Sequence, residues 1–163
     1  MEAAARVRLQ PMPEEAFLRF RQASIRNYAL EQTRAGDWAE AEASLLALKA
    51  FENLLPVGLA TEGHELFEIV DAEVDQVVGI LWYARRDRAG EPIAYVYDLE
   101  IHPAFRRMGH ARAAFRALEE RVAAQGLKGI SLHVFGHNVG ARALYESLGY
   151  HDTHVSMFKA LPG

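Results

Sequence analysis

The 163-residue chain contains no cysteine, which excludes disulfide bonds, cysteine-based zinc sites and a thiol nucleophile. It has no apolar run near the roughly 20 residues that cross a bilayer, and residues 1–6 lack the apolar core of a signal peptide. Excess positive charge is also missing: the formal net charge is −4, which disfavours a nucleic-acid-binding protein. We expect a cytoplasmic protein whose partners are neither nucleic acid nor membrane.

Two common nucleotide-binding motifs are absent as well. The chain has no Gly-Lys-Ser or Gly-Lys-Thr triplet, which a P-loop requires. A Rossmann turn would follow the first strand and carry three glycines, whereas the candidate turn of this chain, residues 106–111, comes late and holds one. The sequence therefore disfavours P-loop NTPases and dinucleotide-dependent dehydrogenases.

What the chain does contain is enough apolar sequence, 50% of its residues, for the core of one domain. Pro13 followed by Glu14 and Glu15 predicts a helix start, because proline fits the first turn and acids favour the positive end of the helix dipole. A second helix is expected from Asp37, which can cap it. The apolar residues that follow at helical spacing are Trp38, Ala41, Leu45 and Leu48.

The remainder alternates between strand and helix patterns. The segment from Gly109 to Gln125 has an apolar helical face, and Asn138 is expected to cap a short helix that Gly149 ends. The expected strands are residues 66–70, 76–84, 92–101, 130–134 and 150–159. With a further strand before the first helix, the order is roughly β-α-α-β-β-β-α-β-α-β, which predicts an α/β (α+β) fold: a mixed sheet with helices on its faces.

Residues 92–101 alternate in character. Asp98 and Glu100 are expected on one face of the strand. The residues expected on the other face are Ile93, Tyr95, Tyr97, Leu99 and Ile101. Because like charges that lie close together raise the pKa of one carboxyl, either acid is a candidate general base. A β-bulge here would change which side chain faces a cleft.

The turn after this strand consists of Arg106, Arg107, Met108, Gly109, His110 and Ala111. Gly109 and Ala111 keep the start of the next helix free of bulk. The first amides of a helix have no intrahelical partners and the dipole is positive there, so this end binds phosphate oxygens. The neighbouring arginines, including Arg112, add charge. The turn therefore favours a pyrophosphate-bearing ligand, although solvated arginines around a packing glycine are the simpler alternative.

At these positions the chain resembles the GNAT superfamily of N-acetyltransferases. The run Ile101-x-Pro103-x-x-Arg106-x-x-Gly109-x-Ala111 is similar to the family's acetyl-CoA motif, (R/Q)-x-x-G-x-(G/A). A second run, Asn138-x-x-Ala141-x-x-Leu144-Tyr145-x-x-Leu148-Gly149-Tyr150, is similar to N-x-x-A-x-x-L-Y-x-x-x-G-(F/Y). The similarity covers about residues 76–159, and residues 132–138 resemble small bacterial GNAT enzymes of unassigned substrate.

The resemblance implies a single N-acetyltransferase domain over residues 1–163. Residues 1–65 would form its helical, acceptor-side part and residues 76–159 its acetyl-CoA-binding core. The implied sheet is mixed and mostly antiparallel, has about six to seven strands and splays between the fourth and the fifth, with about four helices on both faces. A homodimer through the C-terminal strands is compatible with this family.

The same resemblance places acetyl-CoA, as co-substrate, along the splayed strand and the turn. Backbone groups of the strand would pair with the pantetheine arm, and one amide would polarise the thioester carbonyl. The turn would hold the pyrophosphate. The implied cofactor-binding residues are Leu99, Glu100, Ile101, Arg106, Arg107, Met108, Gly109, His110, Ala111, Arg112, Asn138, Ala141 and Tyr145. No metal is expected.

By the same resemblance Tyr145 is the general acid that protonates the departing thiolate, and a phenol with a pKa near 10 suits that leaving group. Tyr145 also fits the apolar stripe of the last helix, as a core tyrosine would. The catalytic base is Glu100 or Asp98, with His133 or a chain of water molecules as alternatives.

The implied activity is transfer of an acetyl group to a primary amine of a small molecule, peptide or protein, by direct attack in a ternary complex. A non-catalytic acyl-CoA-binding sensor or regulatory module would carry the same cofactor motif. An interaction domain without a cofactor is a further alternative. No motif identifies the acceptor, although the acids near the expected cleft favour a cationic amine.

Overall fold

The computed structural model describes residues 5–163. Residues 1–4, part of the segment in which we expect no signal peptide, lie outside the described residues. The elements in chain order are β1 (Val7–Pro11), α1 (Glu14–Arg34), α2 (Glu40–Leu54), the 3-10 turn η1 (Gly58–Ala60), β2 (His64–Asp71), β3 (Gln76–Arg88), β4 (Glu91–Ile101), the 3-10 turn η2 (Pro103–Phe105), α3 (His110–Ala124), β5 (Ile130–Leu132) and α4 (Val139–Ser147).

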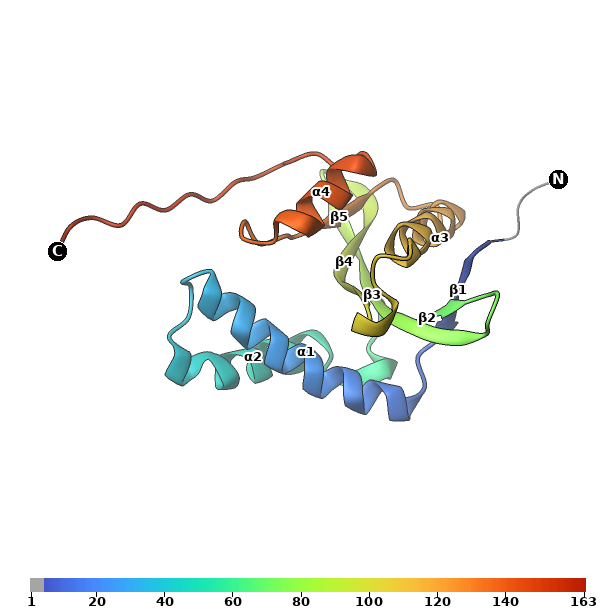
Figure 1. Ribbon diagram of the computed structural model, residues 1–163, viewed down its shortest axis with the longest axis horizontal. Coiled ribbons are helices and arrows are strands. Elements are labelled where there is room, and N and C mark those ends of the chain that lie inside the picture. Colours follow the sequence, from blue (N-terminus) through green and yellow to red (C-terminus); the bar gives the residue numbers. More distant parts are fainter. Residues whose placement is uncertain (1–4) are drawn as a thin grey trace.

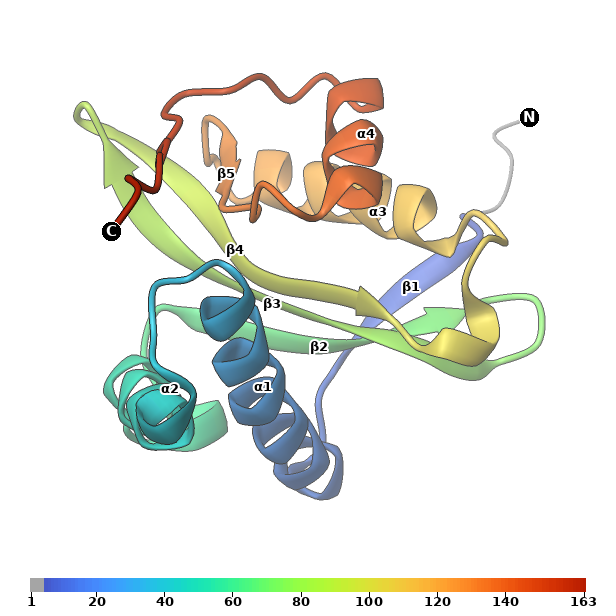
Figure 2. The same cartoon turned by 60° about the vertical axis from the view of Figure 1, so that its left-hand side comes forward.

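The strands form one sheet in the order β1-β2-β3-β4-β5. The first four pair antiparallel, whereas β4 and β5 pair parallel. Helices α1 and α2 cover one face of the sheet, and α3 and α4 cover the other (Figures 1 and 2). The predicted mixed, mostly antiparallel sheet with helices on both faces is therefore confirmed.

The predicted number of strands, about six to seven, is wrong: the sheet within the described residues has five. Residues 150–159, expected as a final strand, form none. This C-terminal segment runs away from the body of the molecule as an extended chain (Figure 1), and its Met157 and Phe158 are more than 90% exposed. An extended segment becomes a strand only beside another strand, and this one does not lie beside the sheet.

Helix α1 begins where the sequence predicts, with Pro13 at its N-cap and two glutamates in its first turn. Helix α2 begins at Glu40, three residues later than expected, and the side chain of Asp37 does not cap it. The predicted apolar stripe is also wrong, since Leu45 is 57% exposed. The buried face of α2 instead carries Ala43 and Ala47, because small residues allow close packing against α1.

The two faces of the sheet have separate cores. An aromatic cluster joins α1 and α2 to β3. In this cluster the rings of Phe20 and Phe51 lie 5.9 and 5.7 Å from the Trp82 ring, measured between centroids. The opposite core is mostly aliphatic and packs α3 against the sheet, with Leu118 fully buried and Phe115 nearly so. Burial of these apolar surfaces fixes each helical layer on its side of the sheet.

Strand β4 does not alternate along its whole length. Adjacent residues of β3, Trp82 and Tyr83, pair with positions 98 and 96 of β4, so Tyr97 is an extra residue in a β-bulge. As a result Tyr97 stacks on Trp82 on the α1–α2 side, whereas Leu99 and Ile101 pack on the α3 side. The prediction that Tyr97 shares a face with Leu99 and Ile101 is therefore wrong.

Candidate active site

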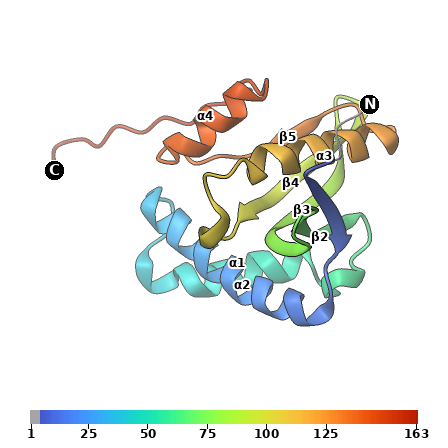
Figure 3. The ribbon, with the colours of Figure 1, turned by 45° about the vertical axis from the view of Figure 1, so that its right-hand side comes forward.

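The turn between β4 and α3 lies at one end of the sheet (Figure 3). Its backbone is left-handed at two positions, Arg107 with φ of 63° and Gly109 with φ of 84°. Gly109 is the N-cap of α3 and offers no side chain to cap it. The first amides of α3 are therefore free to bind an anion, as the sequence predicts for this turn.

The cations around the turn are placed in different ways. The Arg106 side chain folds back along β4, where its Nε donates to the Ile101 carbonyl at 3.0 Å and its guanidinium lies 3.4 Å from a Glu100 oxygen. Arg112 reaches α4 and donates to Ser147 at 2.8 Å. Arg107 and Met108 are exposed, Ala111 is half-buried and His110 is buried.

Strand β4 outruns its neighbour on the side of the cleft. It pairs with β5 only over residues 94–96, opposite residues 130–132, and continues to Ile101. Beyond this short ladder β4 and β5 separate, so the backbone of Leu99, Glu100 and Ile101 has no strand partner on that side. The expected splay between the fourth and fifth strands therefore has a counterpart in the pairing pattern.

An open cleft of about 530 Å³ lies in this gap. It brings together residues of α1, β4, the turn, the end of β5 and the start of α4. They are Asn27, Glu31, Val96, Tyr97, Asp98, Leu99, Glu100, Arg106, Leu132, His133, Asn138 and Tyr145. All three predicted catalytic residues thus line the same cavity.

Asp98 and Tyr145 have perturbed proton affinities. Burial raises the pKa of the Asp98 carboxyl to about 7, and the charge of Glu100 adds to the shift. Burial also raises the pKa of the Tyr145 phenol, with a further contribution from Asp98. At neutral pH the cleft therefore holds a carboxyl near its titration point and a protonated phenol, which suits a base and an acid.

Helix α4 positions the second motif. The side chain of Asn138 caps it by accepting from the Ala141 amide at 3.2 Å, as predicted. Tyr145 lies two turns further along, and its ring meets Phe115 of α3 edge-on at a centroid distance of 5.5 Å. Packing against α3 therefore fixes the ring of Tyr145, which also lines the cleft.

Four residues near the site carry no motif that would have identified them. Asn27 and Glu31 lie one turn apart on α1 and line the cleft, and Glu31 also contacts the His137 ring at 2.5 Å. The Arg6 guanidinium lies beside Gly109, so that a Cβ on Gly109 would meet its Nη1 at 2.8 Å. Asp71 binds His110. Only the i, i+4 spacing of Asn27 and Glu31 is a local signal, and it is a weak one.

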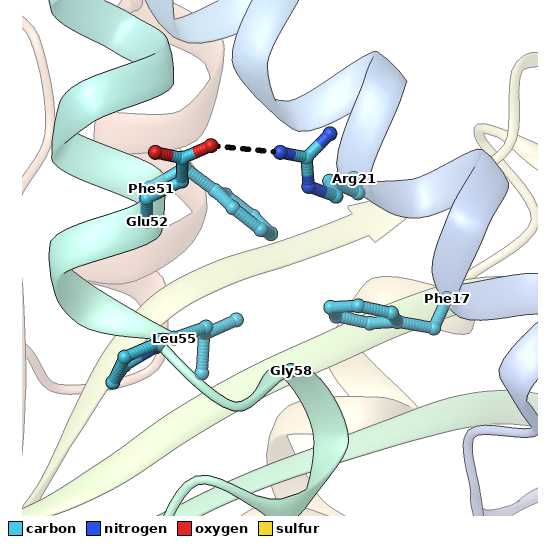
Figure 4. Close-up of a pocket in the computed structure, with 7 residues that line it drawn as sticks. Phe17, Arg21, Phe51, Glu52, Leu55 and Gly58 are labelled. Atoms are coloured by element: carbon cyan, nitrogen blue, oxygen red, sulfur yellow. Dashed lines mark hydrogen bonds and ion pairs between the residues drawn. The ribbon is translucent and has the colours of Figure 1, made fainter.

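A second hollow, of about 380 Å³, lies between α1, α2 and η1 (Figure 4). Its apolar lining includes Phe17, Phe51 and Leu55, and an ion pair between Arg21 and Glu52 spans it at 3.2 Å. It lies outside the gap between β4 and β5, and its two ionisable side chains, Arg21 and Glu52, are paired with each other. We therefore place the chemistry in the β4–β5 cleft.

Metal and membrane features are absent from the part of the chain that the structure describes. No group of three or more histidine or acidic side chains there is arranged to hold a metal ion. None of its helices is both long enough and apolar enough to cross a bilayer.

Comparison with known proteins identifies the fold and the family. The model of the acetyltransferase (GNAT) family matches residues 23–150. This chain belongs to the GNAT family. The matched residues include both sequence motifs, part of α1 and all of α2. They therefore include the turn between β4 and α3 and the α1 residues that line the cleft.

The chain is 37% identical over 155 residues to the uncharacterized N-acetyltransferase YycN of Bacillus subtilis, covering 95% of this chain and 99% of the relative. It is 34% identical over 153 residues to a second such protein of that species, YdgE, covering 94% and 97%. The crystal structure of YycN superimposes with a TM-score of 0.91, at 36% identity and covering 96% and 99% of the two chains. The chain is thus a GNAT-type N-acetyltransferase.

Proposed function

We propose that this enzyme transfers the acetyl group of acetyl-CoA to a primary amine by direct attack within a ternary complex. The observation that carries the proposal is the combination of three features in and beside one cleft. These are an unpaired stretch of β4, an uncapped helix start at Gly109, and a carboxyl–phenol pair with raised pKa values, Asp98 and Tyr145.

The donor half follows from backbone groups. The amides at the start of α3 bind the pyrophosphate, with Arg107 and the Arg6 guanidinium supplying charge beside them. The free edge of β4 at residues 99–101 pairs with the pantetheine arm, and one of its amides polarises the thioester carbonyl. The Asn138 side chain, which caps α4, borders the same path.

The proton transfers follow from the two titratable groups. The amine loses its ammonium proton to Asp98, whose pKa of about 7 leaves it substantially ionised at neutral pH. The neutral amine attacks the thioester carbon, and the carbon–sulfur bond breaks as the amide forms. Tyr145 donates its proton to the departing thiolate, and the second proton that the nitrogen releases as the amide forms returns to the Tyr145 phenolate through water in the open cleft. Of the two candidate carboxyls Asp98 is the better base, because Glu100 is paired with Arg106.

The charge of the cleft favours a cationic acceptor. Three carboxylates line it, those of Glu31, Asp98 and Glu100, against one guanidinium, that of Arg106. Opposite charge raises the local concentration and the affinity of an ammonium group. The acceptor class we propose is therefore a primary amine that is protonated in solution.

Two measurements test the proposal. Calorimetry with acetyl-CoA should detect binding, and release of free CoA should rise when a suitable amine from a panel of cationic and neutral primary amines is added. Absence of binding at millimolar acetyl-CoA excludes the proposed co-substrate. Binding without CoA release for every amine of the panel would favour the alternative, a non-catalytic acyl-CoA sensor.

We also infer a homodimer that uses the C-terminal segment. Val155, Met157, Phe158 and Leu161 of this segment are between 62% and 93% exposed, and apolar side chains in such a row are typical of an interaction surface. Light scattering of the full chain and of a chain ending at residue 150 would test this. A full-length monomer contradicts the inference.

A further inference from the structure

His110 opens α3, but its ring does not lie on the surface of the turn. The residue is 3% exposed. Its Nδ1 lies 3.1 Å from the Phe105 carbonyl oxygen and its Nε2 lies 2.8 Å from an Asp71 carboxylate oxygen. The ring therefore connects Phe105, which lies just before Arg106 in the turn, to the last residue of β2.

Both partners of the ring are acceptors. A carbonyl oxygen cannot donate a hydrogen bond. The hydrogen bond from His110 and the Glu73 backbone amide lower the pKa of Asp71, so its carboxylate is ionised and also only accepts. Nε2 therefore donates to an ionised acceptor, which makes this buried hydrogen bond a charge-assisted one, and Nδ1 faces the Phe105 carbonyl oxygen.

The turn between β4 and α3 has a backbone conformation that is costly to hold. Arg107 and Gly109 both have left-handed backbones, and a non-glycine residue such as Arg107 adopts that conformation at a cost. Asp71 is itself anchored, because it ends β2 and its other carboxylate oxygen accepts from the Glu73 amide at 2.9 Å. His110 thus ties a strained turn to the rigid sheet.

We propose that His110 and Asp71 are positioning residues that hold the phosphate-binding turn in its binding geometry. Neither side chain touches the ligand in this role, and Asp71 acts only through His110. The inference rests on the proposed use of acetyl-CoA. It assigns to His110 a different task from direct cofactor contact, and it brings in Asp71, which lies 39 positions away in the sequence.

Two variants and two ligands test the role. His110→Phe keeps a buried ring of similar shape and removes both hydrogen bonds. Asp71→Asn is milder. The two carboxylate oxygens of Asp71 bond the His110 ring and the Glu73 amide, and one of these hydrogen bonds is lost because the amide nitrogen of asparagine cannot accept a hydrogen bond. The ligands are acetyl-CoA, measured by calorimetry, and S-acetylpantetheine, which has the thioester arm without the phosphates, measured by NMR titration at millimolar concentration.

The control is Glu68→Gln, a matched carboxyl-to-amide change. Glu68 is also buried on β2, 8% exposed, and bonds Gln10 at 3.0 Å rather than the turn. Thermal unfolding of all variants measures the general loss of stability, so that effects on the turn can be separated from it.

For wild type we expect binding of both ligands. In His110→Phe the Kd of acetyl-CoA should rise about tenfold or more, and in Asp71→Asn it should rise by a smaller factor. The Kd of S-acetylpantetheine in these variants, and both Kd values in Glu68→Gln, should stay unchanged. Equal weakening of the two ligands would mean a general structural role and overturn the inference, as would unchanged acetyl-CoA affinity. A wild-type protein that does not bind acetyl-CoA would refute the proposed function itself.

Discussion

The α3–α4 side of the sheet and the α1–α2 side meet at one cleft, but they present different groups to it. The first contributes mostly backbone: the unpaired edge of β4 and, beside the cleft, the amides at the start of α3. The second contributes side chains, Asn27 and Glu31 of α1, in front of an aromatic core. Backbone hydrogen-bonding groups stay the same in almost any sequence that keeps the conformation of the turn, whereas the groups supplied by side chains change with each substitution.

In the function that we propose, this contrast separates binding of the donor from choice of the acceptor. The donor site depends on a few backbone conformations, such as the left-handed Gly109. The wall formed by α1 can be altered without disturbing them, because Asn27 and Glu31 lie about two turns or more beyond its buried packing residues Phe17 and Phe20. We therefore expect large effects from changes to β4 and the turn, and small, acceptor-specific effects from α1.

The largest effect is expected at Asp98, on the strand that both sides share. Asp98→Asn should lower kcat by about a thousandfold, because the amide cannot take the ammonium proton. The affinity for acetyl-CoA should be retained, as calorimetry can verify. A turnover close to that of wild type would transfer the role of base to water or to His133.

The pH profile distinguishes the two carboxyls. With a cationic amine that stays protonated over the pH range tested, kcat/KM should rise with pH through about 7 and then level off as Asp98 ionises. The charge of Glu100 contributes to raising the pKa of Asp98, so Glu100→Gln should move this rise to lower pH. If Glu100 were the base, Glu100→Gln would abolish the rise instead.

The next largest effect is expected at Gly109. Gly109→Val places a β-branched residue at φ of 84° and should weaken acetyl-CoA binding about a hundredfold by displacing the first amides of α3. Gly126→Val is the matched control, since Gly126 has φ of 76° just after the other end of α3 and open space around it. If calorimetry gives the same Kd of acetyl-CoA for the two variants, the phosphates bind elsewhere.

A smaller effect is expected at Tyr145. Tyr145→Phe should lower kcat about tenfold and leave the Kd of acetyl-CoA unchanged, because water in the open cleft can replace part of the general acid. Tyr150→Phe is the control: its ring lies 5.8 Å from that of Tyr145, and its buried hydroxyl has no hydrogen-bond partner within residues 5–163. Steady-state kinetics in which both variants behave alike would return Tyr145 to a packing role.

The same contrast marks what could be predicted from the sequence. The turn, the capping of α4 by Asn138 and the extent of α3 depend on local backbone signals, and each was predictable. The pairs Asp71–His110 and Glu31–His137 join residues 39 and 106 positions apart, and no local pattern indicates them. Such contacts follow from the tertiary packing alone.

Three other predictions were wrong because neighbouring elements, rather than the residues of the segment itself, decide the structure. The bulge at Tyr97 reverses the alternation of β4, and it depends on how β3 and β4 pair rather than on β4 itself. Helix α2 buries its alanines because close approach to α1 outweighs the larger apolar area of Leu45. The C-terminal segment has the composition of a strand, but a strand also requires a neighbouring edge.

The smallest effect is expected on the α1 wall. Glu31→Gln removes one of the three carboxylates of the cleft and the charged partner of His137. The KM for a cationic amine should rise about threefold to fivefold, in keeping with a partly exposed ion pair, while the KM for a neutral amine and the Kd of acetyl-CoA stay constant. Glu52→Gln removes a comparable ion pair in the other hollow and should change none of the three. An equal rise in KM for cationic and neutral amines would mean that Glu31 only holds His137 in place. In that case the side chains of α1 would not select the acceptor, and the contrast between a backbone donor site and a side-chain acceptor site would not hold.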